Sequence, residues 1–410
     1  MTLTTAVPRR SRGAPGDARP LRFRPGRLPA LVLLAWAALM FNVLTRAGDG
    51  MIIPIPPIVS SAMAQSSLVV ALGFALLANP RLVVRPTLFL VLLTVMAVVA
   101  LAVSLHSEFL VGSTYRGVRL VGFVACVWLL TPWWGRDDLV LLRCHWTCLW
   151  AILASVVLGA ALGPGKAFAN DGRLGGTLWP IWPTQVAHYS AVLLGGTAIL
   201  WMCRIITGRH ALLAAVVTSV ILLATHTRTA LLGLVVGLAL ASASLFIGHA
   251  RVRRASVTAL VVGLGTGALV APQIVAWLMR GQSSEDAALL TGRASVWTSV
   301  SQAARPLSHE IFGDGLSNKS FAGQSIDSSW VSTFVDLGWL GIALEISFLL
   351  VLVVMVVTHV RGPRRAVALF LIAYCIVSSF TETGLGDASA YLLDLVVAAS
   401  LLVTPPRPAP

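Results

Sequence analysis

The chain has 410 residues, of which 57% are hydrophobic and 11% charged, and its mean hydropathy is +0.85. Soluble domains average about 45–50% apolar and about 25% charged residues, so this composition excludes a water-soluble globular enzyme. The formal net charge of +14 comes from small basic groups between apolar runs. That pattern is typical of membrane topology determinants, so we expect an integral membrane protein without a nucleic-acid partner.

The N-terminal segment differs in character from the rest of the chain. Residues 1–27 carry seven arginines together with proline and glycine. The apolar run that follows has no small-residue cleavage site and leads into further spans, which argues against a signal peptide. We predict a disordered cytoplasmic tail over 1–27, a single transmembrane domain over 28–404 and a short cytoplasmic tail over 405–410. The cysteine spacing indicates neither structural disulfides nor a metal site.

Apolar runs of roughly 17–25 residues predict an all-α, polytopic membrane protein with about twelve transmembrane helices. The expected spans are 28–46, 58–78, 87–105, 117–133, 140–162, 185–203, 210–225, 229–247, 255–279, 331–358, 366–381 and 388–404. With the N-terminus inside, the cytoplasmic segments hold 20 of the 30 lysines and arginines, as the positive-inside rule requires. Both termini are therefore expected to face the cytoplasm.

Two outer segments are long enough to carry chemistry, namely 163–184 and the loop 280–330 before the tenth span. In the larger one, the run 283–286 (Ser-Ser-Glu-Asp) is a good helix start, so we predict a helix over about 285–304. Its apolar stripe consists of Leu289, Leu290, Val296, Trp297 and Val300. Arg293 falls on that stripe because it lies four residues from Leu289 and four from Trp297.

Two arginines are candidates for binding an anion. Arg228 lies between the seventh and eighth spans, which only residues 225–228 separate, and a cation this close to the membrane typically faces a cavity or a partner. Together with Arg293 it could hold the two phosphates of a lipid diphosphate without a metal. The alternatives are a snorkelling Arg228 and an ion pair of Arg293 with Glu285 or Asp286.

Candidate bases lie near the tenth span. Asp327 could take a proton from an attacking sugar hydroxyl, or it could cap the helix that begins near Ser329. His309 and Glu310 offer a second base or are merely solvated. The acids Asp336, Glu345 and Asp394 lie deeper and are too few for an evident proton relay. For His188 and Tyr189, at the start of the sixth span, we expect structural roles.

The outer loop 170–183 combines glycines and Arg173 with Trp179 and Trp182. Tryptophan faces pack on sugar rings, and a sugar site is one reading of this loop. Tryptophans also populate the membrane interface, and this chain has 13 of them. Both readings stay open from the residues alone.

Several of these segments together resemble the O-antigen ligase and polymerase superfamily. In chain order they are Arg173-Leu174-Gly175-Gly176-Thr177, Thr227-Arg228-Thr229-Ala230, Thr291-Gly292-Arg293 with Trp297, Gly313-Asp314-Gly315, Asp327-Ser328-Ser329-Trp330 and Asp336-Leu337-Gly338-Trp339-Leu340-Gly341. The resemblance covers residues 165–345, and the twelve-span layout with its large outer loop extends it to the whole chain.

The resemblance implies a GT-C-like fold and a metal-independent, inverting glycosyltransferase. Such enzymes move a glycan from a polyprenyl-diphosphate carrier to an acceptor hydroxyl on the outer face of the bacterial plasma membrane. The implied partners are that lipid-linked glycan, an acceptor glycan or glycolipid, and membrane lipids, with no cofactor. Arg228 and Arg293 match the family's two diphosphate-binding arginines. Asp327 stands where the family's ligases have a histidine, so ligase and polymerase activity both remain open.

The expected catalytic residues are therefore Asp327, Arg228 and Arg293, and the expected substrate-binding residues are Arg173, Arg228, Arg293, Trp297 and Trp330. The main alternative is a transporter or flippase of a lipid-linked glycan or small solute, although the chain lacks two similar halves. Another membrane glycosyltransferase would carry paired acids in its first outer loop, where only Asp49 occurs. A peptidoglycan polymerase is a third alternative.

Overall fold

The computed structural model describes residues 28–44, 51–52, 54–279, 293–316, 319–321 and 323–404. Both predicted tails, 1–27 and 405–410, lie outside the described residues. So does the predicted helix start at 283–286, together with Leu289 and Leu290. In the described part, one short antiparallel hairpin of β1 (Ser320–Phe321) and β2 (Gln324–Ser325) accompanies the helices.

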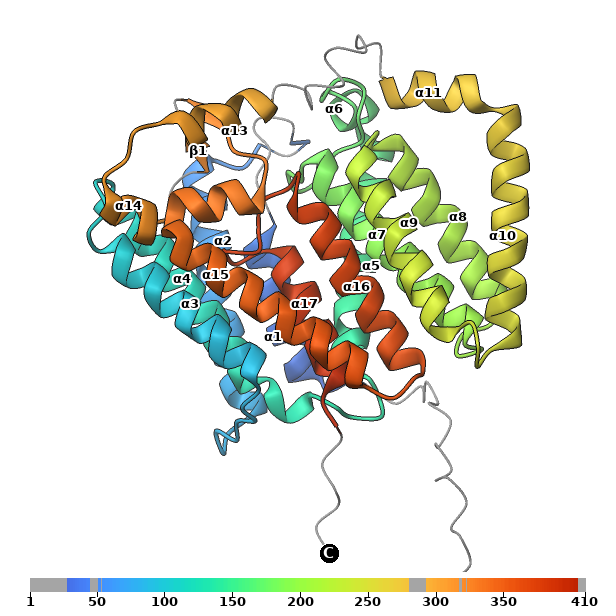
Figure 1. Cartoon of the computed structure of the whole chain (residues 1–410), viewed down its shortest axis with the longest axis horizontal. Helices are drawn as coiled ribbons and strands as arrows, with labels where there is room; N and C mark the ends of the chain where they lie inside the picture. Colours follow the sequence, from blue (N-terminus) through green and yellow to red (C-terminus); the bar gives the residue numbers. More distant parts are fainter. Residues whose placement is uncertain are drawn as a thin grey trace, which may run out of the picture.

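Helices coincide with all the predicted spans (Figure 1). They are α1 (Ala30–Val43), α2 (Pro57–Ala78), α3 (Leu88–Ser104), α4 (Leu110–Leu129), α5 (Val140–Leu162), α7 (Pro183–Met202), α8 (Gly208–Ala224), α9 (Arg228–Leu245), α10 (Ala250–Leu269) with α11 (Ala271–Met279), α15 (Ser329–Thr358), α16 (Pro363–Ser379) and α17 (Ala390–Leu402). Shorter helices are η1 (Thr131–Trp133), α6 (Pro164–Ala167), α13 (Arg293–Gln302) and α14 (Leu307–Phe312). The predicted all-α class is confirmed.

Five of the described helices, α2, α4, α5, α9 and α15, are long and apolar enough to cross a membrane, and α10 with α11 makes a sixth if the bent pair is one span. Four more, α1, α3, α8 and α17, are apolar but have only 10–17 residues. A helix rises about 1.5 Å per residue, so the 14 residues of α1 reach only about 21 Å of a hydrocarbon core of about 30 Å. Helix length and composition therefore support fewer crossings than the predicted twelve.

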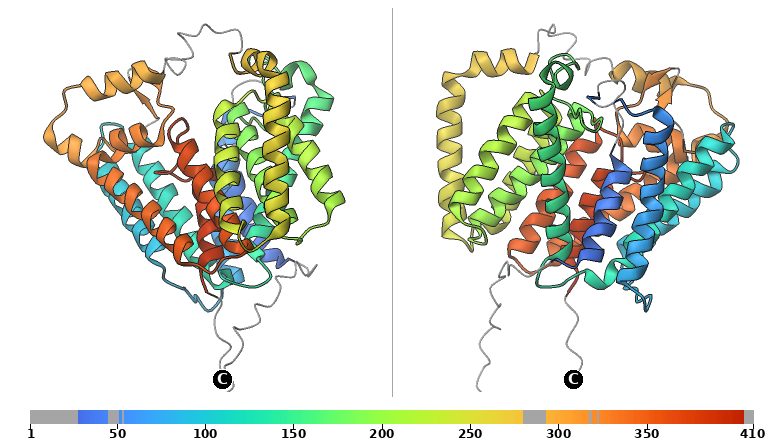
Figure 2. Two further views of the ribbon diagram at one scale, coloured as in Figure 1. Left: turned by 45° about the vertical axis from the view of Figure 1, so that its right-hand side comes forward. Right: turned by 180° about the vertical axis from the view of Figure 1, so that it is seen from behind.

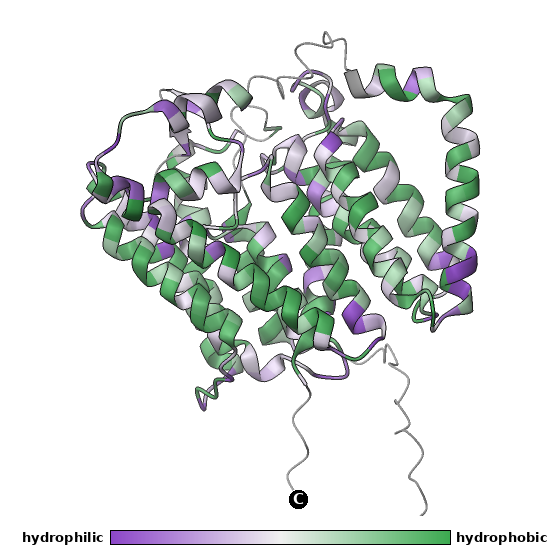
Figure 3. Cartoon of the chain, viewed as in Figure 1, coloured by the Kyte–Doolittle hydropathy of each residue, from purple (hydrophilic) through white to green (hydrophobic). Residues whose placement is uncertain are grey.

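Hydrophobic residues predominate along the long helices (Figure 3). Large hydrophobic side chains point outward with more than half of their surface exposed, among them Leu212, Val220, Val235, Leu264 and Leu350. Soluble proteins rarely expose apolar surface of this extent. These exposed hydrophobic side chains are consistent with a protein that lies in the hydrocarbon core of a membrane.

The predicted span over 255–279 is not one continuous helix. The chain bends by 83° between α10 and α11, and α11 runs across the end of the bundle (Figure 1). Pro272 is the second residue of α11, where proline's missing N–H and fixed φ suit a new helix start. Helix α10 stands at the edge of the bundle, with Val252 as its one buried residue (Figure 2).

The centre of the bundle is α17, all of whose residues are buried. Around it, glycines allow close helix contacts: a Cβ on Gly195 of α7 would lie 2.0 Å from Cζ of Phe370 in α16, and one on Gly237 of α9 would lie 2.7 Å from Cδ2 of the same ring. Small residues commonly permit such close approach in membrane helices. They let α7 and α9 pack directly on α16.

Helix α15 is broken at Gly338, whose φ of 61° and ψ of −159° are not helical. The turn after α14 docks onto this break, because Asp314 N–H donates to Val335 O (3.0 Å) and Gly315 N–H donates to Asp336 O (2.9 Å). A Cβ on Gly338 would lie 2.5 Å from Glu310 O. The two glycine motifs at 313–315 and 336–341 therefore form one backbone junction, which sets the direction of the segment 329–337.

Candidate functional site

The predicted site residues gather at one end of the bundle. This end carries α6, α13, α14, the β-hairpin and the turn between α8 and α9 (Figures 1 and 2). The opposite end carries the start of α10 with Arg251, Arg253 and Arg254, and the end of the described chain after α17. Segments far apart in the sequence thus meet on one face, as the predicted topology requires of outer loops.

Arg293 and Asp327, two of the predicted catalytic residues, are paired with each other. Arg293 Nε lies 3.4 Å from Asp327 Oδ2, and the two side chains are 24% and 45% exposed. Helix α13 begins at Arg293, and its Val296 and Val300 are buried against Ile326 and Val335. That small core holds α13 over α15. Asp327 is not the predicted helix cap, because the N-cap position of α15 is Ser328.

Arg173 joins the outer loop to the turn between α8 and α9. Its Nε donates to Thr225 O (2.9 Å) and its Nη2 to Thr227 Oγ1 (3.1 Å), and Leu174 N–H donates to Ala224 O (2.9 Å). Helix α9 begins at the next residue, Arg228, which is half-buried. The predicted turn over 225–228 is confirmed, and it brings the Arg173 guanidinium next to the residues that precede Arg228 at the start of α9.

Electrostatics link Arg173 to Arg293. Burial lowers the pKa of the Arg173 guanidinium, against the attraction of Glu382 and Asp171, and the positive charge of Arg293 lowers it further. A guanidinium remains protonated under any physiological condition. Two cations from separate segments therefore lie near each other, and both interact with the same carboxylate.

That carboxylate, Glu382, is a residue that the sequence analysis missed. It lies in the loop 380–389 between α16 and α17, where Thr184 hydrogen-bonds its side chain while its Oε1 is buried without a hydrogen-bond partner. Burial raises the pKa of Glu382 to about 7; Arg293 and Arg173 oppose this rise and Asp327 adds to it. The one available signal was an acid in the short loop 380–389, and nothing distinguished Glu382 from Asp387 in the same loop.

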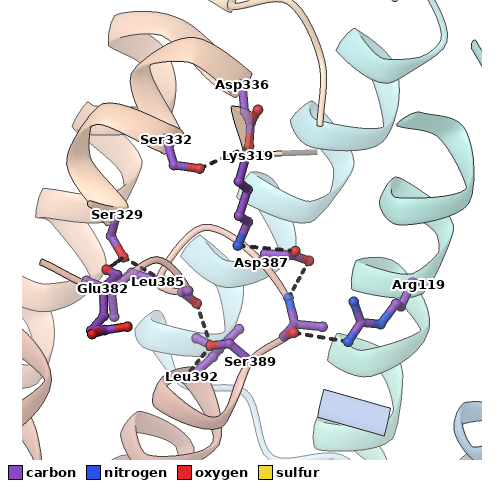
Figure 4. A network of polar contacts seen from close by, with 12 residues as sticks. Arg119, Lys319, Ser329, Ser332, Asp336, Glu382, Leu385, Asp387, Ser389 and Leu392 are labelled. Atoms are coloured by element: carbon purple, nitrogen blue, oxygen red, sulfur yellow. Dashed lines mark hydrogen bonds and ion pairs between the residues drawn. The ribbon is translucent and has the colours of Figure 1, made fainter. Parts of the chain in front are cut away.

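The loop that carries Glu382 is held firmly at both ends (Figure 4). On one side, Glu382 O accepts hydrogen bonds from both N–H and Oγ of Ser329 at 3.0 Å. On the other, Lys319 Nζ lies 3.5 Å from Asp387 Oδ2, and Arg119 donates to Ala388 O. Burial raises the pKa of Asp387, but Lys319 and Arg119 outweigh it and hold this pKa below its usual value.

The predicted substrate-binding tryptophans, Trp297 and Trp330, line one groove of about 490 Å³. Trp339, Phe334 and Arg305 also line it, and Trp330 Nε1 donates to Ser379 Oγ (3.0 Å). Trp330 is three residues after Asp327 and Trp297 is four residues after Arg293, so the groove lies close to this pair along the chain. Aromatic faces with a few polar groups suit a sugar ring or an apolar chain.

His309 and Glu310, the proposed second bases, face different cavities. His309 Nδ1 contacts Asp314 Oδ1, and both residues line a cavity of about 640 Å³ bounded by the loop between α3 and α4. Glu310 lines the tryptophan groove instead. Neither residue contacts the Arg293–Asp327 pair in the part of the chain that the structure describes.

The deep acid Asp394 is paired with two histidines. Its Oδ1 lies 2.7 Å from His145 Nε2 and its Oδ2 lies 3.0 Å from His188 Nε2, and all three side chains are almost fully buried. Trp36 Nε1 donates to His145 Nδ1 (3.2 Å). An indole N–H only donates, so His145 Nδ1 is an acceptor and Nε2 carries the proton. This cluster joins α1, α5, α7 and α17 and supports the expected structural role of His188.

Over the described ranges, no group of three or more His, Cys, Asp or Glu side chains could hold a metal ion. No protein-family model matches the chain. No curated protein matches it either.

Proposed function

We propose that this protein is a membrane glycosyltransferase that moves a glycan from a polyprenyl-diphosphate carrier to an acceptor hydroxyl on the outer face of the bacterial plasma membrane. The single observation that carries the proposal is the gathering of Arg173, Arg293 and the Arg228 turn at one end of an apolar bundle, beside an aromatic groove. Motifs that are 120 residues apart in the sequence contribute to this one region.

The arginines supply the charge that a diphosphate needs. In a transfer of this kind, the bond between the anomeric carbon and the diphosphate oxygen breaks, and its electron pair leaves on the diphosphate. Guanidinium groups stabilise that developing charge, and their planar fork matches phosphate oxygens. Arg293 is half-buried next to Asp327, and Arg228 and Arg173 come from the facing turn and loop, so a diphosphate would enter between them.

The acceptor hydroxyl attacks the anomeric carbon from the face opposite the leaving group, which inverts that carbon. A carboxylate must take the proton of this hydroxyl, and the sequence assigns that role to Asp327. The tryptophan groove, with Trp297 and Trp330, would hold a sugar ring of donor or acceptor. The chemistry needs neither a nucleotide nor a metal, since a charge-matched lipid diphosphate is a good leaving group.

The proposal includes twelve membrane crossings in a GT-C-like arrangement. Its support is that helices occur at all the predicted spans, and that the loops after odd-numbered and even-numbered spans lie at opposite ends. The shorter helices α1, α3, α8 and α17 would then need a locally thinned bilayer or polar flanks that reach the interface.

The test uses a strain that lacks the gene, complemented with wild type, Arg228→Ala or Arg293→Ala. Each variant should abolish transfer, with polyprenyl-linked glycan accumulating on the outer face while the surface polymer is lost. Mass spectrometry of extracted lipids measures the donor pool. Arg228→Lys and Arg293→Lys should rescue poorly, because an ammonium lacks the fork geometry.

The matched control is Arg254→Ala, an exposed arginine at the opposite end, which should leave polymer and donor pool unchanged. Normal membrane levels of every variant are checked by immunoblot. Lipid-linked glycan trapped on the inner face would instead indicate the flippase. Unchanged pools in both arginine variants would refute the assignment.

A further inference from the structure

We propose that the cavity between α14 and the loop joining α3 to α4 is a subsite for the acceptor glycan. We call it the outer cavity; it is bounded by the last turn of α3, residues 106–109, one side of α14 with the turn after it, and β1. Its volume of about 640 Å³ falls within the range of about 300–1,000 Å³ that small-molecule sites occupy. The proposal rests on the proposed glycosyl transfer and adds a second sugar-binding region to the tryptophan groove.

The lining of the outer cavity combines aromatic rings with hydrogen-bonding groups. Phe109 and Phe312 are 77% and 49% exposed, and Phe321 contributes a third ring. An accessible ring offers an apolar face on which the C–H face of a sugar packs. The carboxylates of Glu108 and Asp314, with neighbouring serine hydroxyls, can accept hydrogen bonds from sugar hydroxyls. This mixture suits a saccharide better than it suits a purely apolar chain.

Charge distinguishes the outer cavity from the region that would hold the diphosphate. The described residues that line the cavity include no lysine or arginine, whereas they include two acids, Glu108 and Asp314. Arg305 lines the tryptophan groove instead, although its Nη1 lies 3.6 Å from Asp314 Oδ2. A diphosphate or an anionic lipid headgroup would meet carboxylates here. The glycan part of a substrate is therefore the better ligand.

The walls of the outer cavity are held in place by contacts within the protein. Leu316 N–H donates to Ser104 Oγ (3.1 Å), and a Cβ on Gly315 would lie 3.0 Å from Ser107 Cβ, so the turn after α14 packs closely on the end of α3. Within the α3–α4 loop, Phe109 N–H donates to Ser107 Oγ (3.3 Å). The backbone junction with α15 fixes the turn after α14 from the other side. Sites for small ligands are usually formed in advance in this way.

The outer cavity and the tryptophan groove lie on opposite sides of α14. His309 lines the cavity, and the next residue, Glu310, lines the groove. The guanidinium of Arg305 lies in the wall between them, 5.6 Å from the ring centroid of Phe321 in the cavity and 5.5 Å from that of Phe334 in the groove. A helix is only about 10 Å across. A single oligosaccharide is therefore long enough to contact both regions.

The position of the outer cavity favours the acceptor over the donor. At this end of the bundle, α14 lies at one edge and α8 with α9 at the other, with α13 and α15 between them (Figures 1 and 2). Arg173 and the start of α9 at Arg228 therefore lie across the groove from the cavity. In an inverting transfer the acceptor attacks from the face opposite the leaving diphosphate, so the acceptor would arrive from the cavity side.

The first experiment measures glycan binding by the full-length protein in nanodiscs. The probe is the oligosaccharide fraction that mild acid releases from the envelope of the deletion strain, which retains the unused acceptor and carries no diphosphate after purification. Isothermal titration should show saturable binding to wild type. Phe109→Ala should weaken binding about 2–10-fold through loss of one ring, and Ser308→Trp, which fills the cavity from α14, should abolish it.

Matched variants separate the cavity from general effects. Ser308→Ala changes the same position without filling the cavity and should bind nearly as well as wild type. Phe168→Ala removes a phenylalanine that is 40% exposed at the same end but lines neither the cavity nor the groove, and it should match wild type. All three positions are exposed, so folding should persist, and melting temperatures check this. Inorganic pyrophosphate should not displace the oligosaccharide.

The second experiment connects the outer cavity to transfer. The protein is placed in liposomes with polyprenyl-linked glycan extracted from the deletion strain as donor, and polyprenyl diphosphate release is followed as the acceptor concentration is varied. Phe109→Ala should raise the KM for the acceptor about 2–10-fold, and Ser308→Trp should raise it further. The KM for the donor should stay unchanged in both variants, because the arginines that would bind the diphosphate lie outside the cavity.

The outcomes distinguish this proposal from the function itself. No transfer by wild type, or full activity in Arg228→Ala and Arg293→Ala, would overturn the proposed function. Transfer that depends on both arginines, together with an unchanged acceptor KM in Ser308→Trp, would overturn the acceptor subsite alone. The same conclusion would follow if wild type bound no oligosaccharide, if Ser308→Trp still bound it, or if pyrophosphate displaced it.

Discussion

Replacing Gly338 by alanine tests whether the break in α15 is a built junction. Gly338 has φ 61° and ψ −159°, a conformation that is open to glycine and strained for other residues. An added Cβ would lie 2.5 Å from Glu310 O and from Ile311 C and O, which are backbone atoms and cannot rotate away. The chain must therefore move either the end of α14 or the start of the second half of α15.

The magnitude follows from what such a movement breaks. Backbone strain costs about 1–3 kcal/mol. The bonds from Asp314 N–H and Gly315 N–H to Val335 O and Asp336 O contribute about 1 kcal/mol each. Gly338→Ala should thus lower the free energy of unfolding by about 3–5 kcal/mol. Because the junction directs the segment with Ser329 and Trp330, glycan transfer should also fall.

The assay is thermal unfolding of the purified protein in detergent, with Gly112→Ala as the control. Gly112 lies in α4 with nothing within 4 Å of a built Cβ, so that variant should be neutral or slightly more stable. A Gly338→Ala melting temperature equal to that of the control would show that the break relaxes freely, and would refute this reasoning.

Two further predictions concern the core and the topology. Asp394→Ala leaves His145 and His188 buried without their acceptor and should lower the free energy of unfolding by about 3–5 kcal/mol. His309→Ala, in the half-exposed pair with Asp314, should lower it by less than about 1 kcal/mol. Equal melting temperatures of the two variants would contradict this. In a Cys-free background, Ser320→Cys should react with an impermeant maleimide from outside the cell and Val360→Cys only after the membrane is opened, because the two exposed positions lie at opposite ends of the bundle. Labelling of both from one side would refute the topology.

The residue pattern predicted the helices well because apolar runs are a local property. Short stretches of sequence were enough to predict the turn at 225–228, after which α9 begins at Arg228, and the start of α15 near Ser329. The bend at Pro272 could have been expected from proline alone, but a continuous apolar run concealed it. Composition alone did not determine the number of crossings, because helices of 13–17 residues are apolar without being long enough to span unaided.

The candidate site was predicted in part. Arg293, Asp327, Trp297 and Trp330 were identified from motif order, and the structure places the first two in one ion pair and the last two in one groove. Their mutual pairing was not readable: for Arg293 an ion pair with Glu285 or Asp286 was only the alternative to diphosphate binding, and for Asp327 a helix cap was only the alternative to the role of base. Such pairings join residues 34 positions apart, and only the packing of α13 on α15 brings them together.

The sequence by itself determined that this is an apolar, helical chain with basic groups at one set of loops, because hydropathy and charge act residue by residue. Only the tertiary structure places Glu382 near the candidate residues Arg173 and Arg293. Glu382 is distinguished by burial, by an oxygen without a hydrogen-bond partner and by the charges of these two arginines from other segments. The value at which a carboxyl group titrates is set by its surroundings in space, and the surroundings of Glu382 are assembled from residues 173 to 391 by the packing of the bundle.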